Sequence, residues 1–270
     1  MRDDLLPVLA CPVCAEPLGR VAGGQVGCAN GHRFDEAKQG HLTLLPAKRR
    51  ALTADTPEMV DAWIRFLGRG HYAPVERALA AAVAEATAPG VVLDVGSGPG
   101  TYLAHALGAA DGRLGVALDL SAAAIRRAAR VHERAGAVVG DVTERLPVVD
   151  GAAAVLLDVF APRNQTEYAR VLHPDGVLVV VTPRSGHLAE LAAATITVDP
   201  EKERRLHDSL TPSFVPRASE DLRWTMDLSA DDVHDVVHMG PSHHHVAPDT
   251  VFGPASVTAA VTVSTWTPAR

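Results

Sequence analysis

Short apolar runs alternate with segments of helical periodicity through the middle of the chain. The apolar runs predict strands at residues 91–96, 114–120, 136–141, 152–160 and 176–182. The segments between them predict helices at residues 101–108, 121–134, 164–173 and 186–194. Because strands that alternate with helices are typical of a parallel sheet with both faces covered, we expect an α/β domain.

Two segments near the end of the sequence, 221–229 and 256–266, also have strand character, and they flank a predicted helix at 230–239. A hairpin-like pair that follows five parallel strands would extend the same sheet. The segment 195–220 shows no pattern to which we can assign a role. We therefore expect one domain over residues 91–270.

The residues before this domain lack the alternation and divide into two regions. Residues 1–46 are rich in glycine, hold all three cysteines, and show short apolar alternations of the kind that a small β-ribbon gives. Residues 47–90 begin with a basic run and continue with two predicted helices, the first marked by Met59, Trp63 and Leu67 at helical spacing. The pattern therefore predicts a small domain and a helical connector ahead of the α/β domain.

The composition is that of a globular protein with an uneven charge. Of 270 residues 47% are hydrophobic, which is enough for a sizeable core, and no apolar run approaches the length of a membrane span. The first residues lack the features of a signal peptide, so we expect a cytoplasmic location and no membrane partner. The net charge is −7, but residues 1–80 carry 10 Lys and Arg against 9 Asp and Glu.

This asymmetry places an anionic partner near the N-terminal part of the chain, because the remaining residues carry 15 Lys and Arg against 23 Asp and Glu. The densest basic run is Lys48, Arg49 and Arg50. We interpret it as a binding segment for that partner. A solvated linker is the alternative interpretation.

The three cysteines and one histidine are spaced like the ligands of a zinc ion. Cys11 and Cys14 are separated by two residues, and Cys28 and His32 follow on a second tight turn. Two such turns supply the four thiolate or imidazole ligands that a tetrahedral structural zinc requires. With four ligands in place, we expect an ion that is closed to water and structural. A redox pair of cysteines, and surface thiols beside an incidental histidine, are the alternatives.

A glycine-rich turn follows the first strand of the α/β region. It places Gly96, Gly98 and Gly100 between a strand and a helix, where the backbone must turn sharply and let a ligand approach. The spacing differs from the dinucleotide fingerprint, and Asp94, at the end of the strand, would repel a pyrophosphate. A carboxylate here suits a cationic cofactor, which points to S-adenosylmethionine.

Further carboxylates end the next three strands. Asp119 lies where an acidic side chain would accept hydrogen bonds from the ribose of adenosine. Asp141 lies where the amino group of adenine would need an acceptor, and Asp158 is a candidate group facing the target atom. For each of them, a turn acid that caps the following helix is the alternative.

The motifs together resemble those of a known family. In order they read "CPVC…CANGHRFDEAKQGHLTLLP", "FLGRGHYAPV", "DVGSGPGTY", "VFAPRN", "VVVTPRSGHLAEL" and "MGPS". In this combination and order, which spans nearly the whole chain, the sequence resembles the bacterial 23S rRNA guanine-N1 methyltransferases of the RlmA type. The resemblance is closest to the branch that includes the tylosin-resistance enzyme.

The resemblance implies a Rossmann-like class I methyltransferase domain at residues 91–270, a zinc-binding RNA-recognition domain at 1–46, and a basic linker with a helical connector at 47–90. It also implies S-adenosylmethionine as the methyl donor, and makes 23S rRNA the anionic partner of Lys48, Arg49 and Arg50. The cofactor contacts that it carries over by motif are Tyr72, Gly98, Pro99 and His187. Loss of zinc is then expected to unfold the first 46 residues and to spare the cofactor domain.

The implied substrate is a guanine in hairpin 35 of domain II of 23S rRNA, of the position 748 type associated with macrolide and tylosin resistance. A position 745 target, a small-molecule methyltransferase and a non-catalytic zinc-containing RNA-binding protein are the alternatives. Because N1 of guanine carries a proton on the Watson–Crick edge, the base must be unpaired or flipped and the proton removed. Asp158 is the candidate general base. A monomer and a homodimer both remain open.

Overall fold

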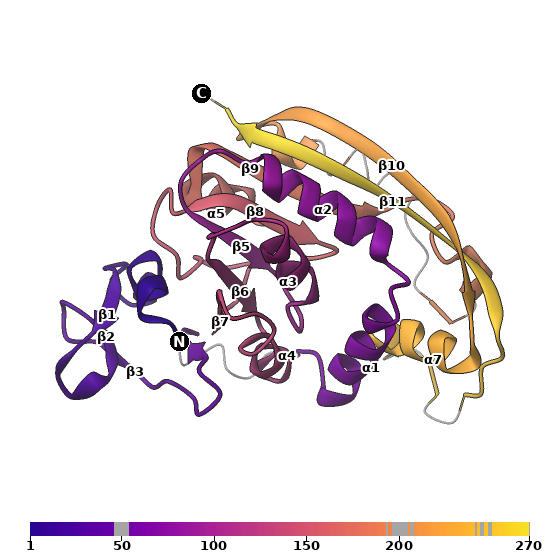
Figure 1. Ribbon diagram of the computed structural model, residues 1–270, viewed down its shortest axis with the longest axis horizontal. Coiled ribbons are helices and arrows are strands. Elements are labelled where there is room, and N and C mark those ends of the chain that lie inside the picture. Colours follow the sequence, from indigo (N-terminus) through magenta and orange to yellow (C-terminus); the bar gives the residue numbers. More distant parts are fainter. Residues whose placement is uncertain are drawn as a thin grey trace.

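The computed structural model describes residues 1–45, 54–192, 194–195, 205, 208–240, 242–243, 246–247 and 250–269. Its centre is an eight-stranded sheet with the strand order β10-β11-β9-β8-β5-β6-β7-β4 (Figure 1). The strands are β4 (Leu42–Thr43), β5 (Val91–Val95), β6 (Gly115–Asp119), β7 (Ala135–Val139), β8 (Ala153–Val159), β9 (Leu172–Pro183), β10 (Phe214–Leu228) and β11 (Ala255–Pro268). Neighbours from β4 to β9 are parallel, and β11 and β10 continue the sheet antiparallel.

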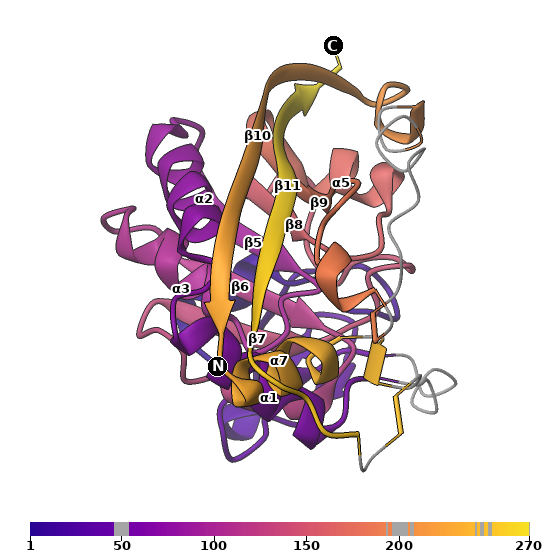
Figure 2. The same ribbon diagram turned by 90° about the vertical axis from the view of Figure 1, so that its right-hand side faces the viewer.

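The predicted α/β fold with a hairpin-like pair at one edge is therefore confirmed. The central strands β5 and β8 are buried along their whole lengths, which explains why they appear in the sequence as continuous apolar runs. Figure 2 shows β10 and β11 running side by side down the middle of the face that is turned to the viewer, and they pair over almost their full lengths. The order of strands turns back at β5, with β6 on one side and β8 on the other.

Helices cover the two faces of the sheet and one of its ends. They are α1 (Pro57–Gly68), α2 (Ala73–Glu85), α3 (Thr101–Gly108), α4 (Ala122–Ala128), α5 (Gln165–Val171) and α7 (Ala230–His238). Helices α2, α3 and α4 share one core with the first face, which includes Leu79, Leu103 and Ile125. Helix α5 contributes Tyr168 and Val171 to the core of the opposite face. Helices α1 and α7 pack together at the lower right of Figure 1.

The N-terminal residues form a small module that is built onto the large sheet. The module contains η1 (Asp3–Val8), β1 (Leu18–Arg20), η2 (Ala22–Gly24), β2 (Val26–Cys28) and β3 (Arg33–Phe34), and its three strands form an antiparallel sheet. Leu5, Leu6 and Leu9 are fully buried in the core that also holds Val116 and Val138 of the large sheet. The first segment thus covers part of the face that α5 leaves open.

Strand β4 strengthens this attachment, because it pairs parallel with β7 and becomes the last strand of the large sheet. The chain between β7 and β8, residues 140–152, forms no helix of its own. It bonds instead to the N-terminal module, since Ala10 donates to the carbonyl of Pro147 and Val149 donates to that of Val8. The domain boundary at residue 46 stays a prediction, but the module before it shares both a core and a sheet with the rest of the chain.

Several element ends differ from the sequence expectations. The helix predicted at 121–134 ends at Ala128, and the guanidinium of Arg134 donates to carbonyls at the end of α3. The helix predicted at 186–194 is a turn with the 3-10 segment η4 (Ala189–Leu191), preceded by Leu188 in the left-handed region at φ 54°. Strand β10 begins seven residues earlier than predicted, at Phe214. No helix in the described part of the chain is long and apolar enough to span a membrane.

Candidate active site and metal centre

The four predicted zinc ligands converge in the N-terminal module. Their ligand atoms all lie within 4.8 Å of one another. Nδ1 of His32 is 3.5 Å from Sγ of Cys11, 3.5 Å from Sγ of Cys14 and 3.4 Å from Sγ of Cys28. The Sγ atoms of Cys14 and Cys28 are 3.7 Å apart. A tetrahedral zinc with Zn–S bonds of about 2.3 Å and a Zn–N bond of about 2.0 Å requires separations of about 3.8 and 3.5 Å.

The backbone around these ligands supports a closed site. The amide of Val13 points at Sγ of Cys11 at 3.4 Å, and Gly31 adopts φ 87° in the second turn, a conformation that a side chain would strain. Cys11 and Cys28 are buried. The set therefore fits a structural zinc, which would tie the two turns to β2 and hold the small sheet together.

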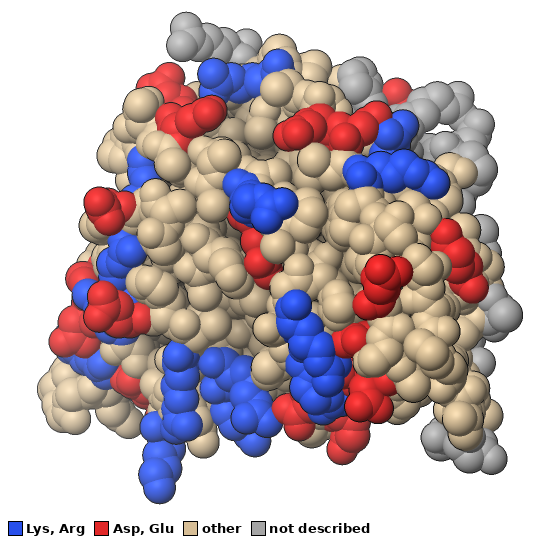
Figure 3. All heavy atoms as spheres, turned by 45° about the vertical axis from the view of Figure 1, so that its right-hand side comes forward, with Lys and Arg blue, Asp and Glu red and all other residues tan. Residues whose placement is uncertain are grey.

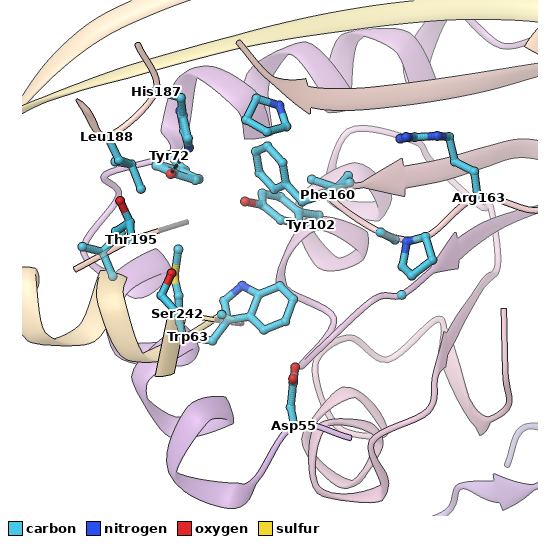
Figure 4. Close-up of a pocket in the computed structure, with 18 of the residues that line it drawn as sticks. Asp55, Trp63, Tyr72, Tyr102, Phe160, Arg163, His187, Leu188, Thr195 and Ser242 are labelled. Atoms are coloured by element: carbon cyan, nitrogen blue, oxygen red, sulfur yellow. Dashed lines mark hydrogen bonds between the residues drawn. The ribbon is translucent and has the colours of Figure 1, made fainter. Parts of the chain in front are cut away.

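A second feature lies at the carboxyl ends of β5, β6, β8 and β9. A cavity of about 1040 Å³ opens there, and helices α1, α3 and α7 close its sides (Figure 4). Four residues predicted to contact the cofactor line it, namely Tyr72, Gly96, Asp119 and His187. Ligands of open α/β sheets bind outside the carboxyl ends of the strands where the strand order reverses, and β5 is that point here.

The glycine-rich turn between β5 and α3 borders this cavity through Gly96. Gly96, Gly98 and Gly100 all have positive φ angles, of 65°, 52° and 82°. A Cβ at Gly96 would lie 2.5 Å from Cβ of Ala161, and one at Gly98 would lie 2.5 Å from the ring of Trp63. The turn therefore needs glycine both for its conformation and for the close approach of its neighbours.

Asp119 ties this turn to the end of β6. Its Oδ2 accepts a hydrogen bond from the amide of Gly98 at 2.8 Å, and its Oδ1 accepts from the amide of Ser121 at 2.7 Å. A carboxylate has about four acceptor positions, so the two oxygens can still accept from ligand hydroxyls. The position at the wall of the cavity fits the predicted contact with a ribose.

Asp94 is buried directly behind the turn, with 1% of its surface exposed. Its Oδ2 has no hydrogen-bond partner. Burial, together with the charges of Asp119 and Asp158, raises the pKa of Asp94 well above its usual range. A buried carboxylate oxygen without a partner is costly, and a positively charged ligand beside the turn would relieve that cost. This observation fits a sulfonium cofactor with an amino group.

Tyr72 and His187 face each other across the upper wall of the cavity, with Tyr72 Oη 3.3 Å from Nε2 of His187 (Figure 4). The amide of Ala260 donates to Nδ1 of His187 at 3.1 Å. In the neutral ring the proton therefore lies on Nε2, which donates to the Tyr72 hydroxyl. Burial raises the pKa of Tyr72, so this hydroxyl stays protonated and is itself a donor.

Asp141 and Asp158 end their strands as predicted, but neither is among the residues that line the cavity. Oδ1 of Asp141 accepts from the amide and the hydroxyl of Thr143, at 2.9 and 2.6 Å, as a local turn acid does. Asp158 is fully buried, and its Oδ2 accepts from the hydroxyl of Tyr168 on α5 at 3.0 Å. The roles of Asp141 at adenine and of Asp158 as general base stay predictions, and these contacts do not support them.

Comparison with known proteins gives the family. Two family models match, "RlmA, N-terminal" over residues 9–51 and "Methyltransferase domain" over residues 93–180. The 23S rRNA (guanine(748)-N1)-methyltransferase of Streptomyces fradiae is 46% identical, over 92% of this chain and 90% of that protein. A Micromonospora griseorubida protein, provisionally assigned to the same class, is 42% identical over 99% of this chain and 100% of its own length. The chain belongs to the 23S rRNA guanine-N1 methyltransferase family.

Solved structures support the fold of the methyltransferase domain. The YcgJ protein of Bacillus subtilis matches with a TM-score of 0.50 at 16% identity, over 72% of this chain and 99% of that one. A chain of the complex between the Haloferax volcanii Trm112 methyltransferase activator and its partner matches with a TM-score of 0.51 at 19% identity, over 79% and 97%. The predicted methyltransferase fold and the zinc ribbon ahead of it are thus confirmed, and the cofactors that they imply are S-adenosylmethionine and structural zinc.

The structure adds residues to the methyltransferase site that the sequence did not indicate. Trp63, which looked like an apolar position of α1, packs its ring against Gly98 and lines the cavity. Phe160 and Arg163, in the loop after β8, line the cavity as well. The motif "VFAPRN" contains both, but no pattern of polar and apolar positions distinguishes them. The predicted RNA-binding residues Lys48, Arg49 and Arg50 lie outside the described residues.

Proposed function

We propose that this chain transfers the methyl group of S-adenosylmethionine to N1 of a guanine in hairpin 35 of 23S rRNA, at the position 748 type of site. The 46% identity to the Streptomyces fradiae enzyme for guanine 748, over nine-tenths of both chains, carries this proposal. The cavity at the glycine-rich turn and the four-ligand centre support it, because the reaction needs a methyl-donor site and a means of holding RNA. A cytoplasmic location, where this substrate occurs, is part of the proposal.

The residues that would hold the cofactor lie around the glycine-rich turn. Asp119 would bind the ribose hydroxyls, and Asp94 would face the positively charged part. Tyr72 would donate its hydroxyl proton to the carboxylate of the cofactor, and His187 would orient this hydroxyl through its Nε2. The bound cofactor supplies an electrophilic methyl group on its sulfonium. Gly98 and Pro99 belong to the turn and Asp141 to the end of β7, and their contacts with the cofactor remain part of the proposal.

For the guanine, the chain has to supply a dry and confined space. N1 lies on the Watson–Crick edge, so the base must leave its stack to reach the cavity. Side chains of α1, α7 and the loop after β8 form part of the cavity wall, where they would shield the bound base from water. Alignment of the nucleophile with the methyl group then accounts for most of the rate, as in other bimolecular displacements.

RNA recognition is assigned to the N-terminal module and to the basic run Lys48, Arg49 and Arg50. Arg126 of α4 and Arg130, two residues after the end of this helix, add to the basic surface, because both are exposed and form no ion pair with the described residues. Figure 3 shows basic side chains gathered along the lower edge of the molecule, with acidic ones among them. Hairpin RNA is held chiefly through its phosphates and shape, so binding should weaken steeply with salt.

Transfer of labelled methyl from S-adenosylmethionine to unmodified 23S rRNA, with the product mapped by a reverse-transcription stop, tests the proposal. A stop at guanine 748 supports it, and a stop at 745 selects the other site of the same family. Transfer to a small molecule instead of RNA, or RNA binding without transfer, would identify one of the alternatives. Sedimentation of the same preparation, with and without RNA, decides between a monomer and a homodimer.

A further inference from the structure

Phe160 adopts a backbone conformation that a bulky residue rarely takes. It follows the last residue of β8 and has φ 59°, in the left-handed region. A non-glycine residue with this conformation is strained unless the surrounding structure holds it, and such residues concentrate at functional sites. The conformation turns the chain so that the aromatic ring points along the cavity wall instead of into the core.

The loop that carries Phe160 is fixed from three sides. The amide of Phe160 donates to the carbonyl of Val181 at 3.1 Å. The hydroxyl of Tyr168 lies 3.0 Å from the carbonyl of Pro162 and 3.0 Å from Oδ2 of Asp158. Ala161 fills the space that Gly96 leaves by lacking a Cβ. These contacts hold the backbone that carries the ring of Phe160.

The surroundings of the ring are those of a binding surface. Phe160 is 38% exposed, although it lines a cavity. Its ring centroid is 6.2 Å from that of Tyr72 and 6.1 Å from that of His187, in tilted arrangements. Figure 4 shows Phe160 near one end of the cavity, with Trp63 and Asp55 towards the other. An exposed aromatic ring at a rigid position is what a planar ligand needs for stacking.

The strand order separates this ring from the nucleoside part of the cofactor. Asp119 ends β6 on one side of β5, whereas Phe160 follows β8 on the other side. The cavity of about 1040 Å³ also lies at the upper end of the roughly 300–1,000 Å³ that is typical for small-ligand sites, which leaves room beside a cofactor. A second planar ligand beside the cofactor is therefore the natural occupant of the side of the cavity that contains Phe160.

Arg163, three residues further along the same loop, supplies a charge at this side. It lines the cavity, is half-buried, and forms no ion pair within the part of the chain that the structure describes. A guanidinium in this position matches the phosphate of a nucleotide. An aromatic ring and a guanidinium held on one loop are suited to a base that is stacked and to the phosphate next to it.

We infer that Phe160 is the surface on which the target guanine stacks after it leaves the RNA, and that Arg163 binds the adjacent phosphate. The inference rests on the proposed function. It assigns substrate positioning to the loop after β8 and gives the two residues separate parts, because one recognises the base face and the other the backbone charge.

The test compares Phe160→Ala, Phe160→Gly and Phe160→Tyr, with Val215→Ala as a control at an exposed apolar position on β10. Phe160→Ala and Phe160→Gly should lower kcat/KM for the RNA by about 5- to 150-fold, the loss that corresponds to one base–aromatic stack. Phe160→Tyr should stay within about threefold of the unaltered chain. Cofactor affinity, measured by calorimetry, should not change in any of them. Phe160→Gly also distinguishes the effect of losing the aromatic ring from the effect of backbone strain, because glycine adopts the same φ freely.

Binding to two hairpins completes the design, one with the target guanine and one with an abasic nucleotide in its place. Phe160→Ala should weaken binding of the first hairpin only, whereas Arg163→Gln should weaken binding of both and reduce the salt slope by about 1. Equal kcat/KM for Phe160→Ala and the unaltered chain, or a loss of cofactor binding in Phe160→Ala, overturns the inference. Failure of the unaltered chain to methylate any RNA while it binds cofactor rejects the proposed function itself, and the inference with it.

Discussion

At the scale of single residues, the raised pKa of Asp94 leads to a prediction about stability and cofactor binding. Its folded pKa is raised by burial and by two neighbouring acids, so without a ligand the protein keeps its proton to a higher pH than the unfolded chain does. The protonated Asp94 therefore contributes to the stability of the folded protein. This contribution is full below the pKa that Asp94 has in the unfolded chain, and it is lost as the pH rises through the folded pKa. At high pH the ligand-free protein therefore contains a strained, ionised Asp94 that a cationic cofactor would neutralise.

Asp94→Asn should consequently make the ligand-free protein more stable at the alkaline end of the range and weaken cofactor binding. The loss in affinity should be about 1.5–3 kcal/mol, as for a hydrogen bond to a charged group. Cofactor affinity of the unaltered chain should rise with pH, and that of the variant should rise less. Calorimetric titration at several pH values measures both, and equal pH profiles would contradict the assignment of Asp94 to the cofactor's charge.

Asp158 and Tyr168 give a second prediction at this scale. If Asp158 positions the loop through Tyr168, then Asp158→Asn should keep much of the activity, because its amide oxygen can still accept from the hydroxyl. Tyr168→Phe should lower kcat/KM for RNA, leave cofactor affinity unchanged, and destabilise the fold by about 1–3 kcal/mol. A general base predicts the opposite order, with Asp158→Asn inactive and Tyr168→Phe active. Methylation rates of the two variants distinguish the roles.

The residues that sequence reasoning located share a local signal. The ligands Cys11, Cys14, Cys28 and His32 follow from spacing within two tight turns, and Asp119 follows from its place at a strand end. A strand end fixes where a residue lies but not which way its side chain bonds. Asp158 is the example, since its side chain bonds to Tyr168 of α5. The positive φ of Phe160 leaves no mark in the sequence at all.

At the scale of elements, the pairing of α1 with α7 sets one wall of the cavity. Arg65 and Arg69 of this pair bond to the buried Asp235, and Arg69 and His71 bond to Asp232. Burial alone would raise the pKa of Asp232, but its bonds to Ser229 and His71 outweigh burial and hold the pKa below the usual range. Helix α7 was predicted from periodicity. The bonds between the two helices could not be predicted in this way, because they connect residues more than 160 positions apart.

Asp235→Ala should therefore destabilise the protein by about 1–3 kcal/mol, less than for a fully buried pair because Arg65 and Arg69 are half exposed and can be hydrated. Because the pKa of Asp232 is lowered, its contribution is present above the unfolded pKa and is lost as the pH falls through the folded value. Urea unfolding at pH 7 and at pH 3 measures both effects. Asp232→Asn should reduce the acid sensitivity, and an unchanged difference between the two pH values would contradict this.

At the scale of the whole molecule, the zinc ribbon is less independent than the sequence suggested. Periodicity predicted separate regions, because a pattern of apolar positions shows that a face is buried but not against what. In the structure Leu5, Leu6 and Leu9 complete a core of the large sheet, and β4 extends that sheet. The expectation that zinc loss spares the cofactor domain therefore changes, since the two parts stabilise each other.

Chelation of zinc should lower the thermal stability of the entire chain and weaken cofactor binding, besides unfolding the module. Leu6→Ala offers a comparison that leaves the ligands intact, and it should cost about 2–5 kcal/mol, as other truncations of buried leucines do. Thermal unfolding followed by tryptophan fluorescence, together with cofactor titration, measures both. Unfolding in two separate transitions after chelation, with cofactor affinity unchanged, would show that the module and the sheet are independent.

The two hydrogen-bonded residues of β4 have a consequence for target choice. They join the ribbon to the sheet at its outer edge, while Figure 1 shows the ribbon at the opposite end of the long axis from α7. If the ribbon binds the RNA, as proposed, then the fixed distance between the ribbon and the cavity determines which nucleotide reaches the methyl donor. Guanines of one hairpin would then be distinguished by their distance from the part of the RNA that the ribbon binds. Lengthening the stem by one base pair should therefore shift or abolish methylation without altering any contact to the base.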